Sequence, residues 1–374
     1  MFHLLESGFI LIFDLLVVKP HEFVQYGLGC LEKFAALGDS CAKEIREKLR
    51  IVVAGGDGTV GWVLGCLGEL DKHGRLPVPP TGIIPLGTGN DLSRSFGWGG
   101  AFAFNWKSAI KRTLDRIANG RICRLDSWHA LISMPAGEEL DTPYSLKATE
   151  EIPLDQNLRQ EQILSNNQHV LGLVFVVLDV ELKATNSLSV PRIRAEDSLL
   201  MRRMSIMKII YSGYSCKQGW FFTPCSSDPG LRGLNNILRI YLKKVNSPEW
   251  VQIPIPSSVR SVVALNLPSY GSGRNPWGFK NQMREFVEAH ADDDFLEIFG
   301  LKHGWHASMV MVELISAKHI AQASSIRFEL RGGEWTEAYM QMDGEPWKQP
   351  MNKEFSTFVE IKRVPFQSVM VHGE

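Results

Sequence analysis

Residues 51–61 read IVVAGGDGTVG, an apolar run that ends in glycines with one aspartate, Asp57, among them. After the turn, apolar residues recur at helical spacing, at Val60, Val63, Leu64 and Leu67. The stretch therefore predicts a strand, a tight turn and a helix. Such a turn leaves backbone N–H groups free for an anion, and the helix dipole adds to the attraction. A phosphate-binding turn and a tight turn without a ligand both stay open here.

A second stretch of the same kind follows at residues 79–91, PPTGIIPLGTGND. Gly87, Thr88 and Gly89 again come after a strand-like run. Asn90 or Asp91 is placed to cap the first N–H groups of a following helix, and capping alone would explain either residue singly. Two glycine turns on one sheet can line one cleft, so the pair favours a ligand-binding function.

The order of the patterns predicts two domains, as the length of 374 residues also suggests. Residues 1–130 alternate helical and strand-like segments, which predicts an α/β domain with a mostly parallel sheet. Residues 131–170 are polar and rich in Pro, Glu and Gln, which is typical of a linker or long loop. Residues 171–374 hold short alternating segments such as VRSVVALNL and SIRFELRGG and predict a β-rich, sandwich-like domain.

Composition excludes several classes of protein. The formal net charge of -1 gives no global attraction to nucleic acid. Six cysteines form no CxxC pair, which argues against a zinc module or a disulfide framework, and we expect mostly buried thiols in a reducing compartment. The apolar N-terminus carries Glu6 and Asp14 and lacks a basic start, so we predict neither a signal peptide nor a transmembrane helix.

Three glycines of the first turn, Gly56, Gly58 and Gly61, satisfy the GxGxxG pattern of dinucleotide-binding folds. Alone, that pattern is a weak signal. The lysine-bearing phosphate loop GxxxxGK[ST] is absent. A dinucleotide-binding oxidoreductase stays open as an alternative, although it would not require the second turn PLGTGND.

Several stretches resemble the diacylglycerol kinase family, and the whole is most similar to its compact plant forms. The resemblance to the family's catalytic domain lies in AGGDGTVGWVL (54–64) and PLGTGNDLSRSFGWG (85–99). The resemblance to the family's accessory domain lies in VALNLPSYGSGRNPWG (263–278), HADDDFLEIFG (290–300) and MQMDGEPWKQP (340–350). The resemblance implies transfer of a phosphoryl group from ATP, with Mg²⁺, to membrane diacylglycerol, giving phosphatidate. It also implies a cytoplasmic protein in peripheral contact with a membrane.

The resemblance also implies roles for individual residues. Asp57 and Asp343 would be the catalytic carboxylates, available to engage metal or to accept the hydroxyl proton, and which of them is the general base is open. The nucleotide would be bound by Gly55, Gly56, Gly58, Thr59, Gly87, Thr88, Gly89, Asn90, Asp91 and Glu345. Without the resemblance, Asp343 would be interpreted as part of an Asp-Gly turn.

An acidic turn at Asp292 and Asp293 is a further candidate magnesium site, because hard oxygen ligands suit that ion. The family pattern has glycine where this chain has Asp294. An acidic surface turn without a metal is the alternative interpretation.

Two departures from the family pattern bear on activity. The family opens with a strand and a glycine turn of the type NPKSGG, whereas this chain begins MFHLLESGFILIFDLLVVKP, so we expect an N-terminally truncated catalytic domain. Residues 171–207 lack the family's Gly-x-Asp-Ala motif. Phosphoryl transfer depends on geometry, so we expect weak or no kinase activity from this form. A non-catalytic, nucleotide-binding relative is therefore a second alternative.

Overall fold

The computed structural model describes residues 3–5, 8–102, 106–134, 169–171, 234–243, 249–278, 286–302, 306, 309–310, 313–333, 336–342 and 345–374. The predicted linker and the atypical segment at 171–207 fall almost entirely outside these ranges. The expectations for both therefore stay predictions.

After two short strands, the first part of the chain is helical, which agrees with the helical segments expected within residues 1–130. Its elements are β1 (His3–Leu5), β2 (Gly8–Ile10), α1 (Pro20–Glu22), η1 (Phe23–Gly27), α2 (Leu28–Ala36) and α3 (Ser40–Lys48). The helical stretch breaks at Gly38, whose φ of 95° favours glycine. Asp39 then starts α3, because its carboxylate accepts the N–H groups of Cys41 and Ala42.

Two parallel strands carry the two glycine turns. They belong to the series β3 (Ile51–Gly55), α4 (Asp57–Lys72), β4 (Thr81–Pro85), α5 (Asp91–Ser95) and α6 (Trp106–Asn119). β3 pairs with β4 in parallel from Ile51↔Thr81 to Gly55↔Pro85. The predicted apolar face of α4, at Val60, Val63, Leu64 and Leu67, is buried. The predicted strand, turn and helix are thus confirmed.

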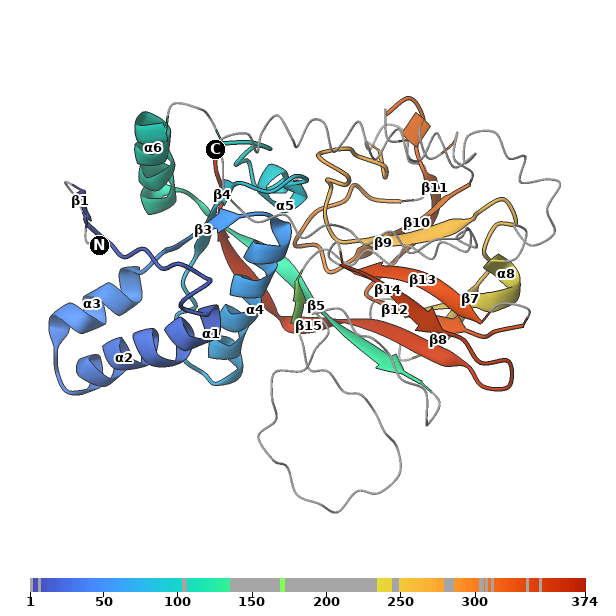
Figure 1. Cartoon of the computed structure of the whole chain (residues 1–374), viewed down its shortest axis with the longest axis horizontal. Helices are drawn as coiled ribbons and strands as arrows, with labels where there is room; N and C mark the ends of the chain where they lie inside the picture. The colour runs from blue at the N-terminus through green and yellow to red at the C-terminus, as the bar shows by residue number, and fades with distance from the viewer. Residues whose placement is uncertain are drawn as a thin grey trace, which may run out of the picture.

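One eight-stranded sheet runs through both halves of the molecule (Figure 1). Its order is β3, β4, β15 (Thr357–Val371), β12 (Ser325–Leu330), β7 (Leu238–Lys243) and β8 (Trp250–Ile253), with β5 (Ile122–Ser133) and β6 (His169–Leu171) branching from β15. β15 lies antiparallel to β12 at its start and parallel to β4 at its end, where Met370 pairs with Thr81. The C-terminal strand therefore returns to the N-terminal region. The predicted domain boundaries stay predictions, and β5 crosses the one at residue 130.

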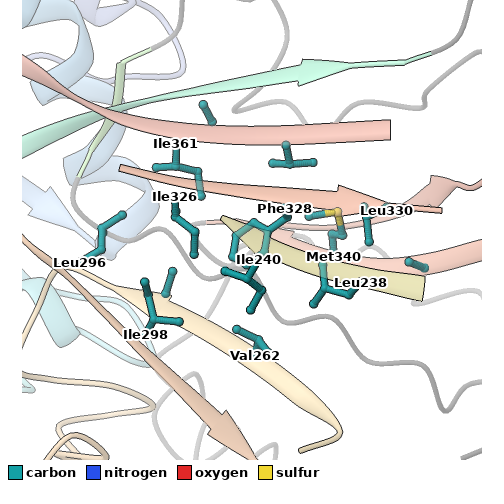
Figure 2. Close-up of a cluster of buried hydrophobic side chains, with 14 of the residues drawn as sticks. Leu238, Ile240, Val262, Leu296, Ile298, Ile326, Phe328, Leu330, Met340 and Ile361 are labelled. Atoms are coloured by element: carbon teal, nitrogen blue, oxygen red, sulfur yellow. The ribbon is translucent and has the colours of Figure 1, made fainter. Parts of the chain in front are cut away.

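The second half is β-rich, as its alternating segments predict. Its other elements are α8 (Leu234–Ile237), the sheet of β9 (Ser261–Leu265), β10 (Leu296–Leu301) and β11 (Lys318–Ala323), and the hairpin of β13 (Glu337–Met342) and β14 (Glu345–Pro350). Figure 2 shows Ile240, Phe328 and Ile361 of the large sheet turned toward Val262 and Ile298 of the three-stranded sheet. All are buried in one apolar core, so the α/β plus β-sandwich prediction is confirmed.

Cysteine exposure corrects one expectation. Cys66 and Cys123 are partly buried, and burial raises the pKa of each thiol to about 11. Cys30 and Cys41 are exposed on the N-terminal helices, so the prediction of buried thiols is wrong for them. They lie on short helices whose polar faces meet water, which a lack of ligand spacing could not reveal. Within the ranges given above, no helix has the length and apolar character needed to cross a membrane.

Candidate active site

The two glycine turns touch at the carboxyl ends of β3 and β4. The Leu86 N–H donates to the Gly55 carbonyl oxygen at 2.9 Å. A Cβ on Gly87 would lie 2.5 Å from the Cα of Gly56, and a Cβ on Gly56 would lie 3.1 Å from the Cα of Gly87. Glycine is needed at both positions because any side chain would force the two backbones apart. The turns therefore form one surface, as the repetition of the pattern predicts.

The Asp57 carboxylate joins the first turn to the helix of the second. Its Oδ2 accepts the N–H of Asp91 at 2.9 Å, and its Oδ1 accepts the N–H of Leu92 at 3.1 Å. These are first-turn amides of α5, which lack partners inside the helix. Burial raises the pKa of the Asp57 carboxyl, and the two amide bonds oppose part of that increase. The site thus holds an oriented carboxylate with an increased proton affinity.

The backbone in front of α4 is open. Gly56 occupies the N-cap position and has no side chain to cap the helix. Gly58 is exposed, and a Cβ there would meet nothing within 4 Å. The Thr59 side chain folds back over Gly55, 2.7 Å from where a Cβ on that glycine would lie. The first turn of α4 therefore offers backbone rather than side chains to a ligand.

Asn90 has a structural task that differs from helix capping. It lies in the left-handed region at φ 54°, is 1% exposed, and its side chain makes no capping bond to α5. Its Oδ1 accepts the N–H of Gly87 at 3.0 Å, and its Nδ2 donates to the carbonyl oxygens of Gly87 and Gly100 at 2.8 and 2.9 Å. Asn90 therefore closes the Gly87–Thr88–Gly89 turn, while Asp57 caps the helix.

Asp91 faces the second half of the molecule. Its Oδ2 accepts the N–H of Ser272 at 3.1 Å, and its Oδ1 accepts the N–H of Gly273 at 2.6 Å. Asp91 is only 6% exposed. Burial, with a further effect from the charge of Asp91, raises the pKa of the Tyr270 hydroxyl to about 12.

Arg94 is a functional candidate that the sequence patterns did not single out. It is exposed on α5, and its Nε lies 3.4 Å from the carbonyl oxygen of Gly89. A Cβ on Gly100 would lie 1.8 Å from its Nη2, and a Cβ on Gly273 would lie 2.8 Å from its Cδ. Its positive charge acts to lower the pKa of Asp57. The sequence signal that could have identified Arg94 is its position as a single positively charged residue shortly after the second glycine turn.

The acidic turn at Asp292 and Asp293 is separate from this surface. The Asp293 carboxylate accepts the N–H groups of His290 and Phe295 at 3.2 and 3.0 Å, and burial raises its pKa to about 6. Asp292 is exposed. Within the described ranges, no group of three or more His, Cys, Asp or Glu side chains is arranged to hold a metal ion.

The remaining site predictions are Asp343 and Glu345. Asp343 is outside the described residues. Glu345 begins β14 and pairs with Met342 in the register of the hairpin. The predicted roles of both residues stay predictions.

Comparison with known proteins covers both halves of the chain. A diacylglycerol kinase catalytic domain model matches residues 29–122, and a diacylglycerol kinase accessory domain model matches residues 182–346. Diacylglycerol kinase 4 of Arabidopsis thaliana is 63% identical over 97% of this chain and 76% of its own length. Diacylglycerol kinase 3 of the same plant is 60% identical over 97% of this chain and 75% of its own length.

Among solved structures, a diacylglycerol kinase from Bacillus anthracis str. Sterne aligns with 95% of this chain and 82% of its own, at 16% identity and a TM-score of 0.42. The relationship rests on the sequence relatives, which favour a kinase over the oxidoreductase that GxGxxG left open. The chain belongs to the diacylglycerol kinase family of phosphotransferases.

Proposed function

We propose that this chain transfers the γ-phosphoryl group of ATP to the free hydroxyl of diacylglycerol, giving phosphatidate. The observation that carries the proposal is the Asp57 carboxylate, held by two α5 amides where the glycine turns meet. Phosphoryl transfer needs positioning and charge neutralisation more than covalent chemistry. An oriented carboxylate beside bare backbone supplies the first of these needs.

In this proposal the glycine turns bind the nucleotide through backbone N–H groups. Gly55, Gly56, Gly58 and Thr59 contribute from one turn, and Gly87, Thr88 and Gly89 contribute from the other. Asp57 is the proposed acceptor of the lipid hydroxyl proton, because two α5 amides orient its carboxylate where the glycine turns meet, and burial raises its pKa above the ordinary value. Asp343 remains the proposed second catalytic carboxylate, and Glu345 a proposed nucleotide contact.

Magnesium fits the donors beside Gly89. The point where a Cβ on Gly89 would lie is 3.5 Å from Asp57 Oδ2 and 3.4 Å from Asp91 Oδ2. Each of these oxygens accepts one backbone N–H group and has a second lone pair, and carboxylate oxygens are the hard donors that Mg²⁺ prefers. A bound Mg²⁺ would neutralise phosphate charge there. Asp292 and Asp293 stay a second proposed metal position, where Asp293, like Asp57 and Asp91, already accepts two N–H groups.

Peripheral contact with an anionic membrane is proposed through helix α6. Lys107, Lys111, Arg112 and Arg116 are all exposed on α6, where Asp115 is the only acidic residue. No ion pair between described residues includes these four cations. A cluster of cations near a membrane gains about 1 kcal/mol for each one from anionic lipid.

The carboxyl end of α6 is fixed against the start of β4. At its carboxyl end, Arg50 Nη1 donates to the carbonyl oxygens of Ile117 and Gly120 at 2.7 and 3.2 Å, and Ile117 packs on Gly82 near the start of β4. Lys107 and Lys111 lie in the first turns of α6, at the opposite end of the helix from these contacts.

The reaction is tested with labelled ATP and Mg²⁺ in mixed micelles that contain diacylglycerol, sphingosine or ceramide. We expect labelled phosphatidate, formed slowly because of the two departures from the family pattern, and no product from the other two lipids. Thermal stabilisation by ATP but not by NADH would support nucleotide binding independently of turnover. Stabilisation by NADH alone, or product only from another lipid, would contradict the proposal.

The membrane contact is tested by sedimentation with vesicles of phosphatidylcholine, with and without phosphatidylserine. We expect the double variant Lys107→Glu/Lys111→Glu to bind anionic vesicles at least ~10-fold more weakly. Lys43→Glu, at an exposed position of α3, is the matched control and should bind nearly as the parent does. Equal losses in both variants would refute a specific role for α6.

A further inference from the structure

A tight turn in the second half of the chain has an unusual backbone. Tyr270 and Arg274 close it with two hydrogen bonds, of 2.7 Å from the Tyr270 N–H and 2.8 Å from the Arg274 N–H. Between them, Gly271, Ser272 and Gly273 all have positive φ, of 57°, 77° and 92°. Serine seldom adopts such a φ, and a strained backbone of this kind persists only where its surroundings enforce it.

The turn points consecutive N–H groups at one carboxylate of the other half. Ser272 and Gly273 donate to the two oxygens of Asp91, a residue that lies 181 and 182 positions earlier in the chain. Successive amides in such a turn form a concavity that binds anions. Here the anion is a side chain of the same molecule, and the Ser272 hydroxyl lies 3.5 Å from the Thr88 carbonyl oxygen as a further, weaker contact.

Asp91 is also hydrogen-bonded to Asp57. While its carboxylate is bound by the Ser272–Gly273 turn, its backbone N–H donates to Asp57 Oδ2 at 2.9 Å. The adjacent Leu92 N–H donates to the other oxygen of Asp57 at 3.1 Å. Hydrogen bonds therefore link the turn to Asp91, and Asp91 to the Asp57 carboxylate.

We propose that the turn at residues 270–274 is a positioning element of the active site, which fixes the start of α5 through Asp91 and thereby orients the Asp57 carboxylate. This inference rests on the proposed function of Asp57. Asp91 acts in it as a positioning residue, because both of its carboxylate oxygens accept backbone N–H groups and its side chain is almost fully buried.

The contact has a specific mechanistic consequence. If the turn is displaced, the α5 amides that hold Asp57 lose their fixed position, while the glycine backbone of residues 55–58 is unaffected. Misplacing a reacting group by about 1 Å costs ~10²-fold in rate. We therefore expect damage to the turn to lower kcat and to leave the KM for ATP nearly unchanged.

Gly273→Ala tests the proposal in the full chain. Alanine at φ 92° is strained, and its Cβ would lie 2.8 Å from Arg94 Cδ, so the turn must shift. We expect a ~10²-fold lower kcat in phosphatidate formation. We also expect faster hydrogen exchange at the Asp91 and Leu92 amides, far from the substitution in sequence.

Gly74→Ala is the matched control for backbone strain. Gly74 also has positive φ, of 65°, and a Cβ there would meet nothing within 4 Å. It follows the carboxyl end of α4, away from the glycine turns. We expect a comparable loss of melting temperature, with kcat and the exchange of the Asp91 and Leu92 amides nearly unchanged.

Asp91→Asn keeps the proposal testable if Gly273→Ala fails to fold. The amide has nearly the size of the carboxylate but cannot accept both N–H groups through oxygen, so exchange at Ser272 and Gly273 should become faster, together with that at Asp91 and Leu92. Unchanged exchange at Asp91 and Leu92 in a folded variant, or a rise in the KM for ATP with kcat preserved, would overturn the proposal. Since exchange needs no turnover, a parent chain without kinase activity would refute the proposed function alone.

Discussion

Two aspartates, the half-buried Asp57 and the fully buried Asp126, occupy contrasting surroundings in this molecule. Asp126 on β5 is fully buried, accepts the Asp294 N–H at 2.6 Å and the Gln367 Nε2 at 2.8 Å, and lies 3.5 Å from the Arg363 guanidinium. Asp57 accepts only backbone amides, and no ion pair between described residues includes it. A carboxylate paired with arginine joins strands together, whereas one held by amides alone keeps its charge available for chemistry.

The largest expected effect is on catalysis, from Asp57→Asn. The change removes the charge and the proton acceptor with little change in size, so we expect phosphatidate formation to fall by ~10²- to 10⁴-fold. Melting temperature should change little. Asp71→Asn, at an exposed position near the end of α4, is the control and should retain activity. Near-full turnover by folded Asp57→Asn would end the catalytic assignment.

The contact between the glycine turns should be nearly as sensitive. In Gly87→Ala the new Cβ would lie 2.5 Å from the Cα of Gly56 and 2.7 Å from Asn90 Oδ1, so the turns must separate. We expect a ~10²-fold loss of kcat/KM, because the nucleotide surface and Asp57 move apart. Steady-state kinetics with ATP and diacylglycerol measure this loss. Gly58→Ala, which meets nothing within 4 Å, separates the effect of steric contact from that of merely replacing a glycine.

Asp126→Ala should affect stability instead. It leaves the Asp294 N–H without its buried acceptor and removes the longer of two ion pairs of Arg363, which also pairs with Asp294 at 2.9 Å. The loss costs about 2 kcal/mol in the free energy of unfolding. Urea unfolding measures the change. Any folded fraction should keep an intact Asp57 environment and near-normal kcat. A large fall in kcat without loss of stability would show that the two aspartates do not have separate tasks.

The last effect appears only as the pH changes and concerns Asp293, a neighbour of Asp126. Burial raises the pKa of this carboxyl from 3.8 to about 6, so the folded chain keeps a proton that the unfolded chain releases. The resulting stabilisation is complete below about 3.8 and is lost as pH rises through about 6. Asp293→Asn should remove this part of the pH dependence in urea unfolding. Parallel stability profiles for the parent and the variant would contradict it.

Much of the site could be predicted because its requirements are local. A strand that ends in GGDG and a second that ends in GTGND fix two tight turns through the conformational freedom of glycine. The face of α4 follows from spacing, and all four predicted apolar residues are buried. The choice between a capping Asn90 and a capping Asp91 could not be made correctly, because the actual cap of α5 is Asp57, from more than thirty residues earlier.

By itself, then, the sequence determined where the glycine turns and their acidic residue lie, since backbone conformation and helical periodicity act over a few residues. The tertiary structure decided which groups those residues meet. It brought the Ser272–Gly273 turn to Asp91, placed Arg94 between Gly89 and Gly273, and divided β15 between the two halves of the molecule. These contacts join residues far apart in the chain, and only the packing of the sheets sets which amide reaches which carboxylate.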